Sequence, residues 1–288
     1  IARGPPMAVK FLGQFLMERG VITPQQLLAA IEAQRASNPL LGELAVRQGL
    51  LTEAQARRIN DRQRADDRRF GDIAMEMGLL EPAQVAGLLI AQKAGRKLFG
   101  EVLLEQGVID LERLESELAA HRAEQDAAQH ALEVGVADHA LAELANGAIA
   151  LSGRLFPRML DSQCQAAGVL APEDLQVWPH TAHVRIDGEQ PMFIGMACGP
   201  ETMQAMACAF LKIGPERCDE ELALDGLGEI VNVLMGYVVR NVLPDDVQYR
   251  AFPPDLATPA AQLAADRDRS LALLMNSRLG PFVLLVGD

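Results

Sequence analysis

Residues 225–236 read Asp-Gly-Leu-Gly-Glu-Ile-Val-Asn-Val-Leu-Met-Gly, a pattern typical of an α-helix with two unlike faces. At about 100° per residue, the polar positions fall within about 60° of one another on a helix: Asp225, Glu229, Asn232 and Gly236. The aliphatic positions take the opposite side: Leu227, Ile230, Val231, Leu234 and Val238. A carboxylate can hold a cation, a carboxamide both donates and accepts hydrogen bonds, and a glycine permits close approach. The stretch therefore predicts a helix whose polar stripe holds a water molecule or a partner's charged group.

Composition and charge limit the classes of function. The 288 residues favour about two domains, and 49% hydrophobic with 23% charged residues is an ordinary globular composition. The net charge of −13 excludes a non-specific nucleic-acid binder, because a polyanion would be repelled. Residues 131–288 carry 21 Asp/Glu against 10 Lys/Arg, whereas residues 1–130 carry 18 against 16. Two modules with different partners are expected.

The cysteines and the hydropathy pattern indicate the compartment. No run of 18 apolar residues is present, so we expect no membrane span and a cytoplasmic location. Four cysteines lack a C-x-x-C pair and a zinc-finger spacing, which predicts reduced, mostly buried thiols and no metal site: Cys164, Cys198, Cys208 and Cys218.

The first half of the chain repeats one unit four times. Glycines recur every 29 residues in two series, Gly13, Gly42, Gly71 and Gly100, and Gly20, Gly49, Gly78 and Gly107. Each unit predicts a short helix closed by its second glycine, then a second helix that begins at a capping residue: Thr23, Thr52, Glu81 or Asp110. Such a helical hairpin is too small to fold alone, so the units are expected to stack.

The unit's pattern is Arg-Leu-Gly, then Leu, Gly, an aliphatic residue, spaced leucines and a closing Gln. It resembles the cyclic di-GMP-binding repeat of the N-terminal domain of type II secretion and type IV pilus assembly ATPases, the MshEN-type domain, over about residues 10–121. The resemblance implies that two tandem units bind one cyclic dinucleotide, with the leading Arg69 and the closing Gln92 contributing. The leading position holds Phe11, Leu40 and Leu98 in the other units. The same glycines and caps would also be expected in a repeat domain that only binds other proteins. No G-x-x-x-x-G-K-[ST] loop follows the repeats, so the ATPase that usually accompanies this domain is not expected.

Beyond the repeats the hydrophobic period changes from 3.6 to 2. The repeats are assigned to residues 8–125, a linker to 126–137 with a helix break near Gly135, and a second domain to 138–288. Helices are expected over 138–160, over 200–212 and from 225 to about 241; strands are expected over 180–186, 192–198, 247–252, 270–275 and 281–286. Strands joined by hairpins, with grouped helices, predict an antiparallel sheet backed by helices, an α+β layout.

The opening stretch carries a second resemblance. The motif D-x-x-x-E-x-x-N-x-x-x-G is similar to the signature of the CheC/CheX/FliY family of chemotaxis phosphatases, and residues 280–284, Gly-Pro-Phe-Val-Leu, resemble the last strand of the CheX branch. The likeness covers about residues 138–288. It implies a hydrolase of two-component signalling that removes the phosphoryl group from the aspartate of a CheY-like response-regulator receiver. It also implies a dimer through this domain.

The same resemblance implies roles for the motif. Asn232 would orient the attacking water, and Glu229 would pair with the receiver's Lys, while the receiver supplies its own Mg²⁺. Asp225 is expected in the first turn of its helix, where it caps the helix or shapes the contact. Gly236 completes the motif. No cofactor of the chain's own is expected, apart from cyclic di-GMP as a regulatory ligand.

A fainter copy of the motif precedes the strands. Glu143 and Asn146 repeat the E-x-x-N spacing, with Ala150 in the glycine's place and His139 in the aspartate's place. This copy is either a second site or a solvated helix face. For the whole chain, the alternative to a phosphatase is a non-enzymatic adaptor that docks receivers and a motility or signalling partner.

Overall fold

The computed structural model describes residues 11–65, 68–244 and 247–288, so residues 8–10 of the expected first domain lie outside it. The chain forms two compact units, the first ending at Ala123 and the second beginning at Glu124. Helix α8 (Leu111–Ala137) continues through Gly135, where a break was predicted. A Cβ at Gly135 would lie 2.9 Å from the Cγ2 of Val169, so the glycine allows close packing inside a continuous helix.

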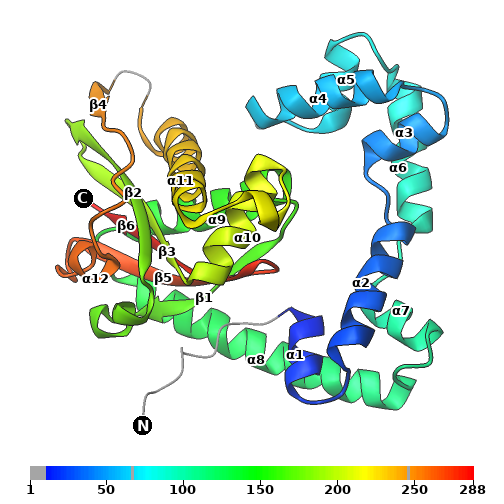
Figure 1. Cartoon of the computed structure of the whole chain (residues 1–288), viewed down its shortest axis with the longest axis horizontal. Helices are drawn as coiled ribbons and strands as arrows, with labels where there is room; N and C mark the ends of the chain where they lie inside the picture. Colours follow the sequence, from blue (N-terminus) through cyan, green and yellow to red (C-terminus); the bar gives the residue numbers. More distant parts are fainter. Residues whose placement is uncertain (1–10, 66–67, 245–246) are drawn as a thin grey trace. The chain divides into compact units, whose positions relative to one another are not determined.

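Helices alone make up the described part of the first unit (Figure 1). Four short helices are each followed by a longer one: α1 (Leu12–Glu18), α2 (Pro24–Ser37), α3 (Leu41–Arg47), α4 (Glu53–Ala65), α5 (Phe70–Glu76), α6 (Pro82–Gly95), α7 (Phe99–Glu105) and α8. The glycine that closes each short helix has φ between +64° and +72°, a conformation that a side chain disfavours. The longer helices begin at the predicted caps; the Thr23 hydroxyl, for example, accepts a hydrogen bond from the Gln26 amide at 3.2 Å.

The apolar cores of the first unit join segments in pairs. We number as segments 1 to 4 the stretches that begin at residues 11, 40, 69 and 98. One core is formed by segments 2 and 3, and the other by segments 1 and 4. A Cβ at Gly13 would lie 3.2 Å from the Phe99 ring, and a Cβ at Gly42 would lie 3.0 Å from the Phe70 ring. Gly13 and Gly42 therefore make room for an aromatic ring of the paired segment, whereas Gly71 and Gly100 face the aliphatic side chains of Val85 and Leu114.

A buried carboxylate distinguishes the second of these pairs. Position 20 of each segment is fully buried: Ala30, Ile59, Leu88 and, in segment 4, Glu117, which is 1% exposed. Arg19 Nε of segment 1 lies 2.6 Å from one Glu117 oxygen, and Arg113 Nη2 lies 2.8 Å from the other. Because a buried charge without a partner is costly, this cluster favours the pairing of segment 4 with segment 1.

The Glu117 cluster predicts an asymmetry between substitutions. Replacing both Arg19 and Arg113 by Ala should lower the free energy of unfolding of the first unit by roughly 3–5 kcal/mol, because Glu117 then stays buried and unpaired. Glu117→Leu restores an apolar residue and should change it by less than about 1 kcal/mol. Urea unfolding followed by circular dichroism measures both, with fluorescence of Trp178, the only tryptophan, reporting the second unit. An equal loss for the two variants would contradict this account.

An antiparallel sheet of six strands is the centre of the second unit, in the order β1-β5-β6-β3-β2-β4. The strands are β1 (Cys164–Leu170), β2 (His180–Gly188), β3 (Met192–Cys198), β4 (Tyr249–Ala251), β5 (Ser270–Ser277) and β6 (Gly280–Gly287). The two predicted hairpins, β2–β3 and β5–β6, are confirmed. Strand β1 was not predicted; its Ala- and Gly-rich sequence has weak strand propensity, and pairing with β5 compensates for this.

The two faces of the sheet are covered differently. Three helices pack on one face and bury the larger core: α9 (Ala142–Met159), α10 (Pro200–Leu211) and α11 (Glu220–Val242) (Figure 1). The short helices η1 (Pro172–Val177) and α12 (Ala260–Leu263) cover the other face around Trp178. This arrangement confirms the predicted antiparallel sheet backed by helices. The remaining short helix is η2 (Pro215–Arg217).

Helix α11 lies in the middle of the larger core. Among the helices that the structure describes, it alone has the length and hydropathy of a membrane-crossing segment. Of its most apolar 18-residue window, however, 61% is buried inside the protein. The apolar residues of α11 are therefore accounted for by core packing.

Candidate functional site

The start of α11 positions the polar stripe. The helix begins after Asp219, whose carboxylate accepts a hydrogen bond from the Leu222 amide at 2.9 Å. Asp225 was expected in the first turn, but it lies beyond that turn and does not cap the helix. The missed signal is the run Asp219-Glu220-Glu221, because acidic residues are favoured at a helix N-terminus. The predicted capping role of Asp225 is therefore wrong.

The two faces of α11 are as predicted. The aliphatic side is at most 2% exposed: Leu227, Ile230, Val231, Leu234 and Val238. The polar stripe, Asp225, Glu229, Asn232 and Gly236, is exposed. On the buried side, a Cβ at Gly226 would lie 2.9 Å from the Cβ of Ala207 in α10, so glycine lets the two helices approach closely. The packed side thus holds the stripe rigidly at the surface.

The functional groups of the stripe are free to meet another molecule. Within residues 11–65, 68–244 and 247–288, the side chains of Asp225, Glu229 and Asn232 form no hydrogen bond or ion pair. No atom lies within 4 Å of the place where a Cβ would stand at Gly236, so the end of the stripe is open. A carboxylate and a carboxamide, about one turn apart and both unpaired, are thus presented on a fixed backbone.

Arg240 extends the stripe by one further turn and was missed. It is exposed, its Nε donates to the Gly236 carbonyl at 3.2 Å, and its guanidinium lies 4.5 Å from the centre of the Tyr237 ring. These contacts fix a positive charge beside the open glycine. The signal in the sequence was the spacing of four residues from Gly236, which continues the helical face.

The fainter copy of the motif lies on α9. Glu143, Asn146 and Ala150 are exposed on this helix. The helix begins at Ala142 rather than at residue 138, so His139 precedes it. His139 Nδ1 accepts a hydrogen bond from the Leu141 amide at 3.0 Å, which leaves Nε2 to donate to the Arg267 carbonyl at 2.7 Å. The residue in the aspartate's place is thus part of a turn.

Arg69 and Gln92 occupy different environments in the first unit. Arg69 is exposed at the N-terminal cap of α5. Gln92 is half-buried, and its Nε2 donates to the Pro39 carbonyl at 2.9 Å. The closing glutamines of segments 1 and 2 make equivalent bonds, from Gln34 to the Lys97 carbonyl and from Gln63 to the Arg68 carbonyl. The closing glutamine therefore has a role in the fold.

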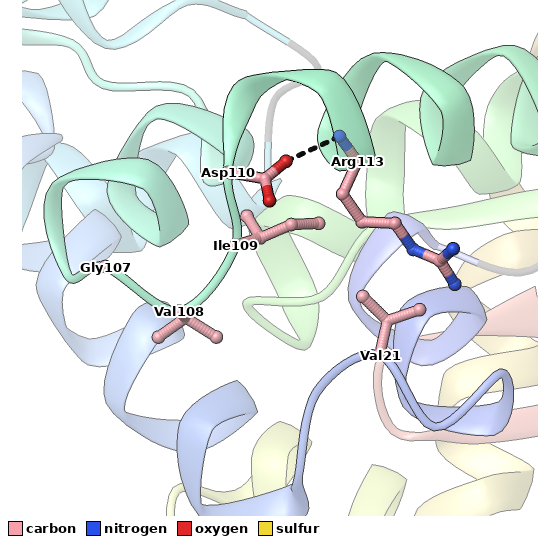
Figure 2. A pocket seen from close by; sticks show the side chains of 6 residues that line it. All are labelled: Val21, Gly107, Val108, Ile109, Asp110 and Arg113. Carbon is pink, nitrogen blue, oxygen red and sulfur yellow. Dashed lines mark hydrogen bonds between the residues drawn. The ribbon is translucent and has the colours of Figure 1, made fainter.

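A hollow of about 500 Å³ lies between segments 1 and 4 (Figure 2). It is lined by Val21, Gly107, Val108, Ile109, Asp110 and Arg113. Asp110 accepts a hydrogen bond from the Arg113 amide at 2.8 Å, and the Arg113 guanidinium is paired with Glu117. Neither Arg69 nor Gln92 lines this hollow. Among the residues that the structure describes, no group of three or more His, Cys, Asp or Glu side chains could hold a metal ion.

Comparisons with known proteins give structural neighbours only. No protein-family model matches the chain, and no curated protein matches it. The chemotaxis protein CheX from Vibrio vulnificus is 15% identical, with 52% of this chain and 99% of that chain covered and a TM-score of 0.41. CheX from Desulfovibrio desulfuricans is 15% identical over 50% and 97% of the two chains, with a TM-score of 0.38. A chain in a CheX–CheY–BeF3–Mg complex from Borrelia burgdorferi is 12% identical, with 50% of this chain and 92% of that chain covered and a TM-score of 0.36.

Proposed function

We propose that the second unit hydrolyses the phosphoaspartyl group of a response-regulator receiver domain. The observation that carries this proposal is the pair of unpaired side chains, Glu229 and Asn232, exposed on a helix whose opposite side is buried. The motif that these residues share with the chemotaxis phosphatases supports it. A receiver can reach both groups without any rearrangement of the core.

The chemistry needs little from this chain. An acyl phosphate is already activated, and a receiver brings the Mg²⁺ and the Lys that neutralise its phosphoryl oxygens. Asn232 would hold a water in line with phosphorus; a carboxamide does so without adding negative charge near those oxygens. Glu229 would form an ion pair with the receiver's Lys and set the docking register. The fixed backbone of α11 supplies the positioning.

Two substitutions should separate these roles. Asn232→Ala should slow phosphate loss from a bound, phosphorylated receiver by roughly 100-fold, because water positioning is lost, and leave receiver binding nearly unchanged. Glu229→Gln should mainly weaken binding, because an ion pair is lost. Single-turnover kinetics over a range of protein concentrations measures both the rate of phosphate loss in the complex and the affinity for the receiver.

Matched controls lie on the same helix. Asn241 is exposed, and its carboxamide donates to the Tyr237 carbonyl at 2.7 Å, while Glu221 is exposed in the first turn. Asn241→Ala and Glu221→Gln should keep the wild-type rate. If wild type and Asn232→Ala both bind the receiver without changing its rate of phosphate loss, the chain is an adaptor and the phosphatase proposal fails.

The copy on α9 should contribute little. The first motif position of this copy holds His139 instead of an acidic residue, and two hydrogen bonds hold its ring in the turn before α9. The double variant Glu143→Gln/Asn146→Ala should therefore keep the phosphatase rate within about twofold of wild type. A loss as large as that of Asn232→Ala would show instead that α9 carries a working site.

For the first unit we propose a sensing or interaction module, with cyclic di-GMP as the ligand to test. Arg69 is exposed and available to an anionic ligand. Calorimetric titration of the full chain should give heat that Arg69→Ala reduces. No heat from either protein would leave only a protein-interaction platform.

A further inference from the structure

An arginine follows both copies of the motif at the same spacing. On α11, Arg240 comes four residues after Gly236, and on α9, Arg154 comes four residues after Ala150. Residues four apart share a helix face, so each arginine continues the polar stripe of its helix. Both are exposed. The unit that is repeated in this chain therefore extends one turn beyond the glycine position and ends in a guanidinium group.

The position within the helix does not explain both arginines. Arg240 is in the last turn of α11, where a cation complements the partial negative charge of a helix C-terminus. Helix α9 continues to Met159, and its last turn already holds Arg158. Arg154 comes before that turn, so the helix dipole does not require a cation there. The recurrence therefore indicates a role that belongs to the motif rather than to the helix end.

The Arg240 side chain is held in place, yet it keeps donors to offer. Its Nε donates to the Gly236 carbonyl at 3.2 Å, and its guanidinium lies 4.5 Å from the centre of the ring of Tyr237, which is buried. Within the part of the chain that the structure describes, its two terminal nitrogens have no hydrogen-bond or ion-pair partner. A guanidinium fixed in this way matches the planar geometry of a carboxylate.

The spacing along α11 defines what Arg240 can touch. At 1.5 Å per residue, Asn232 and Arg240 lie about 12 Å apart along the helix axis, and Glu229 and Arg240 about 16 Å apart. A typical docked surface of about 800 Å² per partner is roughly 30 Å across. One domain that covers Asn232 therefore also covers Arg240, and the open position at Gly236 lets it lie against the helix between them. The guanidinium is too distant to join the chemistry at Asn232.

We propose that Arg240 is a positioning residue that binds a carboxylate on the surface of the receiver, beside its phosphorylation site. Glu229 meets a cation at one end of the stripe and Arg240 meets an anion at the other, so opposite charges fix the direction in which the receiver lies along α11. A receiver turned end to end would bring like charges together at both places. This inference rests on the proposed function and deepens it.

Binding kinetics of the full chain with a CheY-like receiver, loaded with beryllofluoride and Mg²⁺, test this role. Arg240→Glu should lower the association rate constant by roughly 10-fold or more and change the dissociation rate less, because a charge at the edge of an interface steers the encounter. Arg240→Lys should cost only about threefold, because the charge remains. Phosphate loss from a bound, phosphorylated receiver should stay within about twofold of wild type for both variants.

Arg267→Glu is the matched control for the change in net charge. Arg267 is exposed and pairs with Glu173 of η1, on the face of the sheet opposite to α11. This variant should bind the receiver as wild type does. A loss equal to that of Arg240→Glu would mean general repulsion and would overturn the proposal.

Charge reversal on the receiver completes the test. One substitution of a receiver Asp or Glu by Lys should weaken binding to wild type and restore binding to Arg240→Glu. If wild type accelerates phosphate loss but Arg240→Glu binds equally well, or no receiver reversal restores its binding, the role of Arg240 is refuted while the phosphatase proposal stands. A wild type that neither binds the receiver nor accelerates its phosphate loss would overturn both.

Discussion

Burial of one side of α11 is the constraint on which the second unit depends. The helix packs against α9, α10 and the sheet through side chains that are almost wholly hidden from solvent. Because that side is fixed, the opposite side cannot rotate inward, and Glu229 and Asn232 must face solvent. The same packing that stabilises the domain therefore presents the polar groups at a fixed spacing. Stability and the proposed function share one element, as expected when a site is built on a rigid helix.

Much of the second unit could be predicted because its signals are local. Strands β2, β3, β5 and β6 show strong apolar content between turn residues, and α11 shows a clear helical period. Strand β1 could not be predicted, because its small residues become a strand only through pairing with β5. The cap at Asp219 was missed because the motif, rather than the acidic run before it, was taken as the helix start. Arg240 was missed because the motif ends at Gly236.

The first unit shows a different limit. Its glycines and caps predict the conformation of each segment, yet segments that resemble one another do not say which pairs with which. The structure joins segment 1 to segment 4 and segment 2 to segment 3. Among the repeat residues that the structure describes, Glu117 is the one charged residue at a position that is apolar and buried in the other segments, and it needs Arg19 from the distant segment. The sequence shows that Glu117 differs from the other three segments at this position, but only the structure shows that Arg19 is its partner.

We propose that the exposed stripe of α11 completes an active site that belongs to another protein. The most direct measurement is a crystal structure of the full chain with a receiver held in its phosphorylated form by beryllofluoride and Mg²⁺. We expect the Asn232 carboxamide to hydrogen-bond a water in line with the beryllium and Glu229 to lie against the receiver's Lys. A receiver bound to another surface, with Asn232 facing solvent, would contradict the account.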